Sequence, residues 1–312
     1  MPRHSPEAIA AIVSALDLIE DDHFPLPGIE VDAARRTFAM QVIDSMRRIE
    51  FVSVAAARHI SPNRGNPNND MFDPVRAALL ALRRRDVDEA AWITFLFVHF
   101  GMHPQAKWRF IREVYGKLGA QPGWTWATIS QDPEVFRDWL RESQDHLLRG
   151  RRRGFGNHRK YQSMDADKPT GTGAAIVSYV DWVMANGGHR QLFANAYNAG
   201  NNDYYAAFDW LYKKMDAVIS FGRIAKFDYL TMLGKLAITP IKPPKTYIAN
   251  ATGPKTGAKL MLQGNTGAGL SYVELERRLW IMGESLGVDM QVIEDSLCNW
   301  QKSSQRYRLF GG

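Results

Sequence analysis

A short stretch between residues 247 and 262, YIANATGPKTGAKLML, carries residue types that bind phosphate. Gly253 tolerates positive φ and Pro254 suits the first position of a helix, so the stretch predicts a tight turn that opens directly into a helix. The unpaired backbone N–H groups of a helix start attract anions, and Lys255 and Lys259 add positive charge beside them. An ordinary capped helix start is the alternative. The residues that we expect to contact phosphate here are Gly253, Thr256, Gly257 and Lys259, with Lys255 beside them.

A second stretch, residues 149–161, holds the densest positive charge of the chain. Phe155 and Tyr161 are interleaved with its cations, which is typical of surfaces that bind nucleic acid. A solvated loop after a helix end is the alternative, because cations are favoured there as well. The residues that we expect to contact nucleic-acid phosphates are Arg151, Arg152, Arg153, Arg159 and Lys160.

Other patterns that carry chemistry in many proteins are incomplete in this chain. His99 and His103 have the spacing of a two-histidine metal site, but no acid or cysteine nearby completes a ligand set. No glycine-rich stretch ends in the Gly-Lys-Ser/Thr of a nucleotide-binding loop. Apolar neighbours favour an inert, buried thiol for Cys298. We therefore expect no metal and no cofactor.

The composition describes an ordinary globular protein. The chain has 312 residues, of which 45% are hydrophobic and 23% charged, and its formal net charge is +6. These values exclude a disordered chain, a collagen-like repeat and a disulfide scaffold. With Cys298 as the only cysteine and no apolar stretch long enough to cross a bilayer, we expect a soluble, cytoplasmic protein.

The elements that must position these residues are helices. Apolar residues recur at spacings of three and four along residues 31–57, and alternating strand patterns are nearly absent. Asp73 and Pro74 start another predicted helix, and residues 86–101 form an almost wholly apolar one that we expect to be the most buried. The remaining predicted helices cover residues 104–118, 133–148, 173–185, 203–218, 222–236, 254–263, 270–286 and 288–301.

Changes in composition along the chain predict three parts. Residues 1–148 form an N-terminal helical lobe, and residues 149–172 form a basic, glycine-rich connecting loop. Residues 173–312 form a C-terminal helical lobe that contains the turn at Gly253.

The order of four blocks resembles a known family. Residues 252–257 match the second half of the hairpin of helix–hairpin–helix DNA glycosylases, with Ala251 where that hairpin has its first glycine. Residues 221–236 precede it as an amphipathic helix. Together with residues 156–161 and 294–302, these blocks resemble the alpha-glutamyl/putrescinyl thymine pyrophosphorylase family, clade 3, an offshoot of the glycosylase superfamily tied to hypermodified pyrimidines in phage DNA. Phage-defence glycosylases that excise glucosylated hydroxymethylcytosine are similar.

The resemblance implies an all-α, helix–hairpin–helix DNA glycosylase-like fold with two helical lobes around a cleft. It implies excision of a hypermodified pyrimidine, with α-glucosyl-5-hydroxymethylcytosine as the best candidate, which leaves abasic sites and blocks phage replication. Such chemistry needs a carboxylate near the sugar. Glu274 lies nearest to the family's register and Glu294 is its rival, although Glu274 also suits a helix start. Lys255 aligns with the lysine of bifunctional members, while phosphate contact is its plainer role.

Excision requires the nucleotide to be flipped into a pocket. The candidate pocket residues are His158, Tyr161, Asn198 and Trp300, of which the aromatic ones are also typical of helix cores. The expected partner is double-stranded phage DNA with hypermodified bases, without an obligate protein partner. Two alternatives stay open: a pyrophosphorylase-type enzyme that builds hypermodified thymine in DNA, and a non-catalytic DNA-binding protein.

Overall fold

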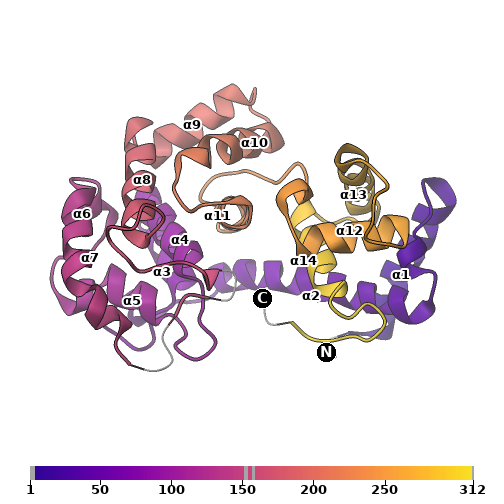
Figure 1. Cartoon of the computed structure of the whole chain (residues 1–312), viewed down its shortest axis with the longest axis horizontal. Helices are drawn as coiled ribbons and strands as arrows, with labels where there is room; N and C mark the ends of the chain where they lie inside the picture. The colour runs from indigo at the N-terminus through magenta and orange to yellow at the C-terminus, as the bar shows by residue number, and fades with distance from the viewer. Residues whose placement is uncertain (1–3, 151–153, 157–158, 311–312) are drawn as a thin grey trace. The chain divides into compact units, whose positions relative to one another are not determined.

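The protein is all-helical, as predicted. The computed structural model describes residues 4–150, 154–156 and 159–310, and in these ranges it contains helices and short 3₁₀ turns but no strand (Figure 1). The chain divides into two compact units. Met1–Phe51 and Pro243–Gly312 form the first, here called the terminal unit, and Val52–Lys242 form the second, the central unit.

The terminal unit brings both ends of the chain into one hydrophobic core. Phe38, Leu279, Ile293 and Trp300 are fully buried in it, and the Trp300 indole packs edge-on against Phe38. Because these residues come from segments more than 200 positions apart, neither end forms a core alone. Its elements are α1 (Pro6–Asp22), η1 (Pro27–Ile29), α2 (Asp32–Ala57), η6 (Ile248–Asn250), α12 (Gly253–Gln263), α13 (Tyr272–Leu286) and α14 (Met290–Trp300), with the last residues of α2 belonging to the central unit.

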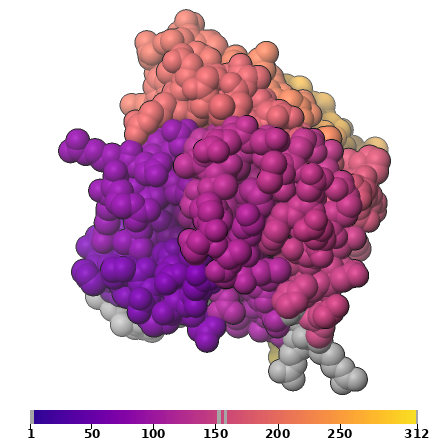
Figure 2. Space-filling model, turned by 90° about the vertical axis from the view of Figure 1, so that its left-hand side faces the viewer, coloured from indigo at the N-terminus to yellow at the C-terminus, as the bar shows by residue number. Residues whose placement is uncertain are grey.

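The central unit is built around α4 (Val87–Phe100), of which all but three residues are buried. The sequence prediction for this helix is confirmed: an apolar pattern on every side corresponds to burial on every side. Figure 2 shows this unit from the side on which α6 and α7 lie in Figure 1. The other elements are η2 (Pro62–Arg64), α3 (Pro74–Arg83), α5 (Arg109–Tyr115), η3 (Lys117–Gly119), α6 (Trp126–Ile129), α7 (Pro133–Leu148), α8 (Thr172–Ala185), α9 (His189–Ala199), α10 (Tyr204–Lys214), η5 (Met215–Ala217) and α11 (Arg223–Lys235).

Side-chain caps explain where many of the helices begin. Asp73 accepts a hydrogen bond from the Arg76 N–H at the start of α3, at 3.0 Å, and Asp86 caps α4 in the same way. Each cap satisfies a backbone donor that has no partner inside the helix. The same role falls to Ser5, Asp132, Asp203, Ser271 and Asp289.

The units do not follow the three-part division expected from composition. Residues 149–172 lie within the central unit, and the division falls instead at 51/52 and 242/243. Composition reports local changes along the chain, whereas the units arise from packing between distant segments. The first unit therefore joins the two chain ends.

Two helical segments differ from the predictions. The helix predicted over residues 104–118 is only the seven-residue α5, because residues 103–108 form a separate turn. A helix that the sequence analysis missed, α9, covers residues that include Asn198. The weak apolar periodicity of α9 and the asparagines after it had indicated a turn.

Candidate nucleic-acid interface

The segment before α12 is held by one carboxylate. Glu276, on α13, accepts hydrogen bonds from the N–H and hydroxyl of Thr246 and from the N–H of Ile248, each at 2.8 Å. Between these two residues Tyr247 has φ +52°, a left-handed conformation that a residue with a Cβ rarely adopts. Three hydrogen bonds to Glu276 stabilise this strained position, so the approach to α12 has a fixed conformation.

The glycines of α12 serve helix packing. A Cβ on Gly257 would lie 2.4 Å from the carbonyl oxygen of Leu297, and one on Gly253 would lie 2.8 Å from the Cys298 sulfur. Both glycines therefore face α14 and let the two backbones approach closely. Gly257 is buried. Gly257 thus does not face solvent as a phosphate contact, contrary to the expectation from the sequence.

The polar residues of α12 lie nearer the surface. Lys255 and Lys259 are half-buried, with their ammonium groups toward the backbone oxygens of Ala249, at 3.5 Å, and Gly267, at 2.7 Å. The Thr256 hydroxyl donates to the Thr252 carbonyl at 3.0 Å. The acceptors of both lysines are backbone carbonyls, which carry no formal charge.

Two tyrosines accompany this charge. The Lys255 ammonium lies 5.8 Å from the ring centre of Tyr272, the first residue of α13, and the Lys245 ammonium lies 4.9 Å from the ring of Tyr247. Tyr272 is 44% exposed. We call Lys245, Tyr247, Lys255, Lys259 and Tyr272 the hairpin face. Cations beside exposed aromatic rings are the combination that binds phosphates and stacks on bases.

This turn is not a complete helix–hairpin–helix. Only the 3₁₀ turn η6 comes directly before α12, while α11 ends at Lys235 and belongs to the central unit. Residues 236–252 separate the two helices. At the residues of the motif match, the structure has a bend followed by the start of α12.

The two candidate carboxylates differ in environment. Hydrogen bonds from Arg277 and then Arg278 hold the pKa of Glu274 at about 2, so this side chain stays ionised at neutral pH. It lies in the first turn of α13, where the helix dipole also favours a negative charge. Glu294 lies half-buried in the middle of α14.

The basic segment divides into residues with different roles. Arg151–Arg153 and His158 lie outside the described residues. Arg159 is 7% exposed, and it donates to the carbonyls of His99, at 3.3 Å, and Ser220, at 3.0 Å. Burial lowers the pKa of Arg159 to about 10. Its guanidinium therefore joins two backbone segments inside the unit. This differs from the sequence analysis, which predicted that Arg159 contacts nucleic-acid phosphates at the surface.

Lys160 and Tyr161 are the exposed part of this segment. Tyr161 is 87% exposed, and the Lys160 ammonium lies 5.0 Å from its ring centre. An exposed ring beside a cation can stack on a base at a surface. A ring so open to solvent is not a wall of a closed pocket.

The remaining candidates for the base pocket belong to different units. Trp300 is fully buried in the core of the terminal unit, where its indole N–H donates to the Ala34 carbonyl at 3.1 Å. Asn198 is exposed on α9 of the central unit. Trp300 is therefore a core residue. The sequence analysis gave this as the alternative to a pocket role, because aromatic residues in helices are typical of cores.

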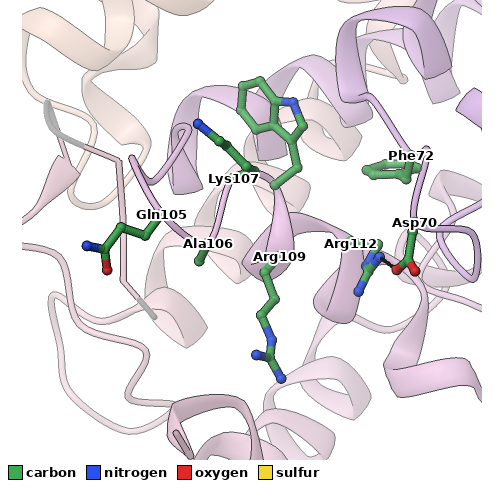
Figure 3. Close-up of a pocket in the computed structure, with 8 residues that line it drawn as sticks. Asp70, Phe72, Gln105, Ala106, Lys107, Arg109 and Arg112 are labelled. Carbon is green, nitrogen blue, oxygen red and sulfur yellow. Dashed lines mark hydrogen bonds and ion pairs between the residues drawn. The ribbon is translucent and has the colours of Figure 1, made fainter. Parts of the chain in front are cut away.

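A pocket that the sequence analysis missed lies in the central unit (Figure 3). Its lining includes Lys107, Trp108, Arg109 and Arg112, from the end of the turn before α5 and from α5 itself. The signal was present: residues 103–112, HPQAKWRFIR, mix cations with aromatic residues as the segment 149–161 does. It was overlooked because the helical pattern of this stretch dominated its interpretation.

A buried polar chain connects four helices of the central unit. The His189 ring bonds Asp88 through Nδ1, at 2.9 Å, and Tyr179 through Nε2, at 2.7 Å, and the Tyr179 hydroxyl bonds that of Tyr229 at 2.8 Å. Burial lowers the pKa of His189, although Asp88 opposes this effect. A neutral imidazole that donates to Asp88 and accepts from Tyr179 fits every contact, so the chain satisfies polar groups inside an aromatic core.

His99 and His103, the pair with metal-site spacing, have separate structural roles. The His99 Nε2 bonds the Thr172 hydroxyl at 3.0 Å inside the core, and burial holds the pKa of His99 well below its ordinary value. His103 Nδ1 accepts from the N–H groups of Gln105 and Ala106. Among the residues of the described ranges, no three His, Cys, Asp or Glu side chains cluster as metal ligands would.

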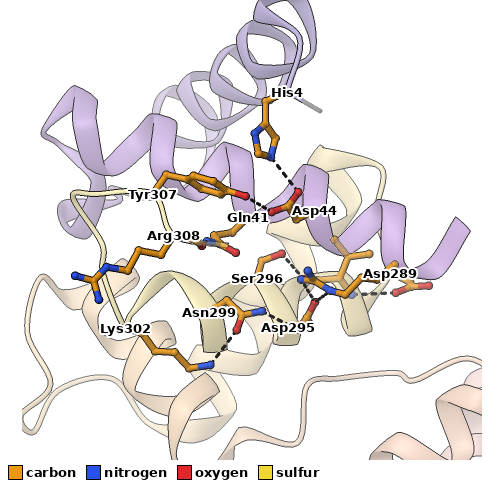
Figure 4. Close-up of polar contacts among 12 residues, drawn as sticks. His4, Gln41, Asp44, Asp289, Asp295, Ser296, Asn299, Lys302, Tyr307 and Arg308 are labelled. Carbon is orange, nitrogen blue, oxygen red and sulfur yellow. Dashed lines mark hydrogen bonds and ion pairs between the residues drawn. The ribbon is translucent and has the colours of Figure 1, made fainter. Parts of the chain in front are cut away.

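Polar contacts also fix the C-terminal segment onto α2 in the terminal unit (Figure 4). Asp44, 1% exposed, accepts from the Tyr307 hydroxyl at 2.6 Å and bonds His4 Nε2 at 3.0 Å. The Gln41 amide donates to the Arg308 carbonyl at 2.8 Å. The segment after α14 is therefore part of this unit.

A comparison with protein families gives one match. The model of the family described as alpha-glutamyl/putrescinyl thymine pyrophosphorylase clade 3 matches residues 33–312. No curated protein and no solved structure matches the chain. Over the described residues, no helix is both long enough and apolar enough to cross a membrane.

Proposed function

The chain belongs to the alpha-glutamyl/putrescinyl thymine pyrophosphorylase family, clade 3, and from this premise we propose that it is a DNA glycosylase that excises a hypermodified pyrimidine. Membership of the family links the chain to enzymes that act on modified DNA bases. The proposed substrate is double-stranded phage DNA that contains α-glucosyl-5-hydroxymethylcytosine. Its product is an abasic site, which blocks replication of the phage.

The hairpin face is the observation that supports the proposal most directly. Lys255 and Lys259 place positive charge along the start of α12, where the Tyr272 ring lies beside Lys255. Before the helix, the Tyr247 ring lies beside Lys245. Glu276 fixes the strained turn before the helix. A preformed surface of this kind binds the sugar–phosphate backbone without an ordering cost.

In the proposed reaction, water replaces the base on the sugar. The bond between N1 of the pyrimidine and C1′ breaks with its electron pair leaving on the base, water supplies a hydroxyl to C1′, and the base takes up the remaining proton. A carboxylate stabilises the positive charge that develops on the sugar. Glu274 is ionised, as this role requires, and Glu294 is the second candidate.

The test uses phage DNA that contains the glucosylated base and unmodified DNA of the same sequence, in the presence of EDTA. Alkali-dependent strand breaks in the modified DNA alone are the expected result. Breaks that form before alkali treatment would assign Lys255 to Schiff-base chemistry. Intact modified DNA would refute the proposal for this base.

Variants separate the two carboxylates. We expect Glu274→Gln or Glu294→Gln to lower the rate of base release by more than about tenfold. Glu284→Gln, an exposed position on the same helix as Glu274, is the matched control and leaves the rate unchanged. If both carboxylate variants keep the wild-type rate, neither residue is the catalytic carboxylate.

The family description favours a second candidate function, synthesis of a hypermodified thymine with displacement of pyrophosphate. The two candidates differ in what happens to the base, which leaves the DNA only in the glycosylase reaction. The products therefore distinguish them.

A further inference from the structure

The pocket of the central unit has the size and lining of a ligand site. Its volume is about 360 Å³, within the range of small-molecule sites. Figure 3 shows Arg112 beside Asp70, with Lys107 and Arg109 at separate places of the lining. No residue of the hairpin face lines it, because those residues belong to the other unit.

The lining carries three cations and one carboxylate. Arg112 pairs with Asp70, and Arg109 pairs with Glu113, four residues further along α5. The Asp70 side chain is 98% exposed, so water screens its pair with Arg112. Within the described ranges no carboxylate pairs with Lys107. The lining therefore keeps a positive excess, which attracts an anionic group.

The backbone that presents Lys107 is fixed. His103 and Lys107 exchange two backbone hydrogen bonds, of 3.1 and 2.9 Å, and the His103 ring accepts two N–H groups from the turn between them. Lys107 itself has φ +52°, which this bonding maintains. A cation held in a strained, closed turn is positioned before any ligand arrives.

The basic segment runs directly against this turn. The Gly156 N–H donates to the Phe100 carbonyl at 2.6 Å, and a Cβ on Gly156 would lie 2.7 Å from the backbone of Gly101. A Cβ on Gly154 would lie 3.2 Å from the His103 ring. Gly154 and Gly156 thus lie close to the backbone and ring of residues 100–103, next to the turn that presents Lys107.

Phe72 and Trp108 are the aromatic residues of the lining, and Trp108 is the one that lies between two of its cations in the sequence. Trp108 lies between Lys107 and Arg109 in the sequence, is half-buried, and packs against Phe97 with ring centres 5.3 Å apart. Phe97 supports the indole while the indole still lines the pocket. A supported aromatic ring beside cations is the arrangement that stacks on a nucleobase while its phosphate is neutralised.

We propose that this pocket binds a nucleoside phosphate, with the phosphate against Lys107, Arg109 and Arg112 and the base against Trp108. The nucleotide is either part of a DNA strand or free in solution. The inference rests on the proposed function in one respect: an enzyme that acts on DNA meets DNA strands that could occupy the pocket. The pocket is a separate binding site from the hairpin face.

Calorimetric titration of the full-length protein tests the proposal with defined probes: dTMP, thymidine, inorganic phosphate and the single strand (dT)6. We expect dTMP or (dT)6 to bind at least about tenfold more tightly than thymidine or phosphate, because only a nucleotide uses both parts of the pocket. Tighter binding of (dT)6 than of dTMP identifies the strand as the source, and tighter binding of dTMP identifies the free nucleotide.

Variants assign the binding to this pocket. Lys107→Ala and Trp108→Leu should each weaken binding of the preferred probe by about tenfold, while Trp108→Phe keeps most of it because it retains a ring. For (dT)6, Lys107→Ala should also reduce the slope of log affinity against log salt by about one. Lys213→Ala removes one charge from an exposed position on α10 and is the matched control.

The outcomes separate this inference from the proposed function. Equal binding of all four probes, or affinities of Lys107→Ala and Trp108→Leu that match that of Lys213→Ala, would overturn the pocket assignment even if base release is normal. Binding that depends on Lys107 and Trp108 confirms the pocket even if no DNA loses a base. Circular dichroism verifies that each variant is folded. Trp108→Phe and Trp108→Leu both keep an apolar side chain, so a difference in binding between them reports the effect of the aromatic ring.

Discussion

Replacing Gly257 with alanine tests whether this glycine serves helix packing. The added Cβ would lie 2.4 Å from the Leu297 carbonyl oxygen and 3.0 Å from the Leu297 Cβ. Ordinary contacts of this kind are at least about 3.4 Å long, so α12 and α14 must separate by about 1 Å. The clash is with backbone on α14, which cannot rotate away as a side chain does.

The expected cost follows from two opposing effects. Overpacking a closely packed contact costs about 1–3 kcal/mol, and a backbone clash belongs at the upper end. Alanine in place of glycine within a helix contributes about 1 kcal/mol in the opposite direction. We therefore expect Gly257→Ala to lower the free energy of unfolding by about 2 kcal/mol.

Denaturant unfolding followed by circular dichroism measures this change. Gly222→Ala is the control, because a Cβ at Gly222 would meet no atom within 4 Å, and we expect a change below about 0.5 kcal/mol. DNA binding of folded Gly257→Ala is the second measurement. Unchanged stability together with weaker DNA binding would refute the packing role and restore Gly257 as a phosphate contact.

Four further predictions concern single side chains. Glu276→Gln should lower the free energy of unfolding by about 1–3 kcal/mol and weaken DNA binding, because three hydrogen bonds to the turn are weakened or lost. Unfolding and binding titrations that match those of the wild type would contradict this. Because the pKa of Glu274 is about 2, the pH–rate profile should show no loss of activity from its protonation above pH 4, and Glu274→Gln should not alter the profile's shape there. Burial lowers the folded-state pKa values of His99 and His189 below 6.5, so the unfolded chain takes up these protons first and the melting temperature should fall as the pH drops below about 6.5; a melting temperature that rises there would contradict it. Trp300→Ala should cost about 3–5 kcal/mol in chemical unfolding, whereas a purely base-contacting Trp300 would leave stability unchanged.

Local patterns predicted much of the helical structure. Asp73 and Asp86 cap α3 and α4 as the sequence indicates, since a cap depends on neighbours within three residues. The almost wholly apolar pattern of residues 86–101 predicted that this helix is buried, because the pattern is visible within the segment itself. The start of α12 was also recognisable, because Pro254 suits the first turn of a helix.

Packing between distant segments could not be predicted. Arg159 is buried because carbonyls 60 residues away on each side accept its hydrogen bonds, and nothing near it in the sequence indicates this. Trp300 lies in the core because the first and last parts of the chain fold together. The glycines of α12 match a phosphate-binding turn, yet the approach of α14 explains them.

The fate of the base in modified DNA tests the central claim most directly. Phage DNA with glucosylated hydroxymethylcytosine is incubated with the protein, and mass spectrometry analyses both the released small molecules and the nucleosides that remain in the DNA. A glycosylase releases the free glucosylated base and leaves an equal amount of abasic sites, which is the result that we predict. A base that stays attached to its sugar, whether unchanged or further modified, would contradict the proposed function.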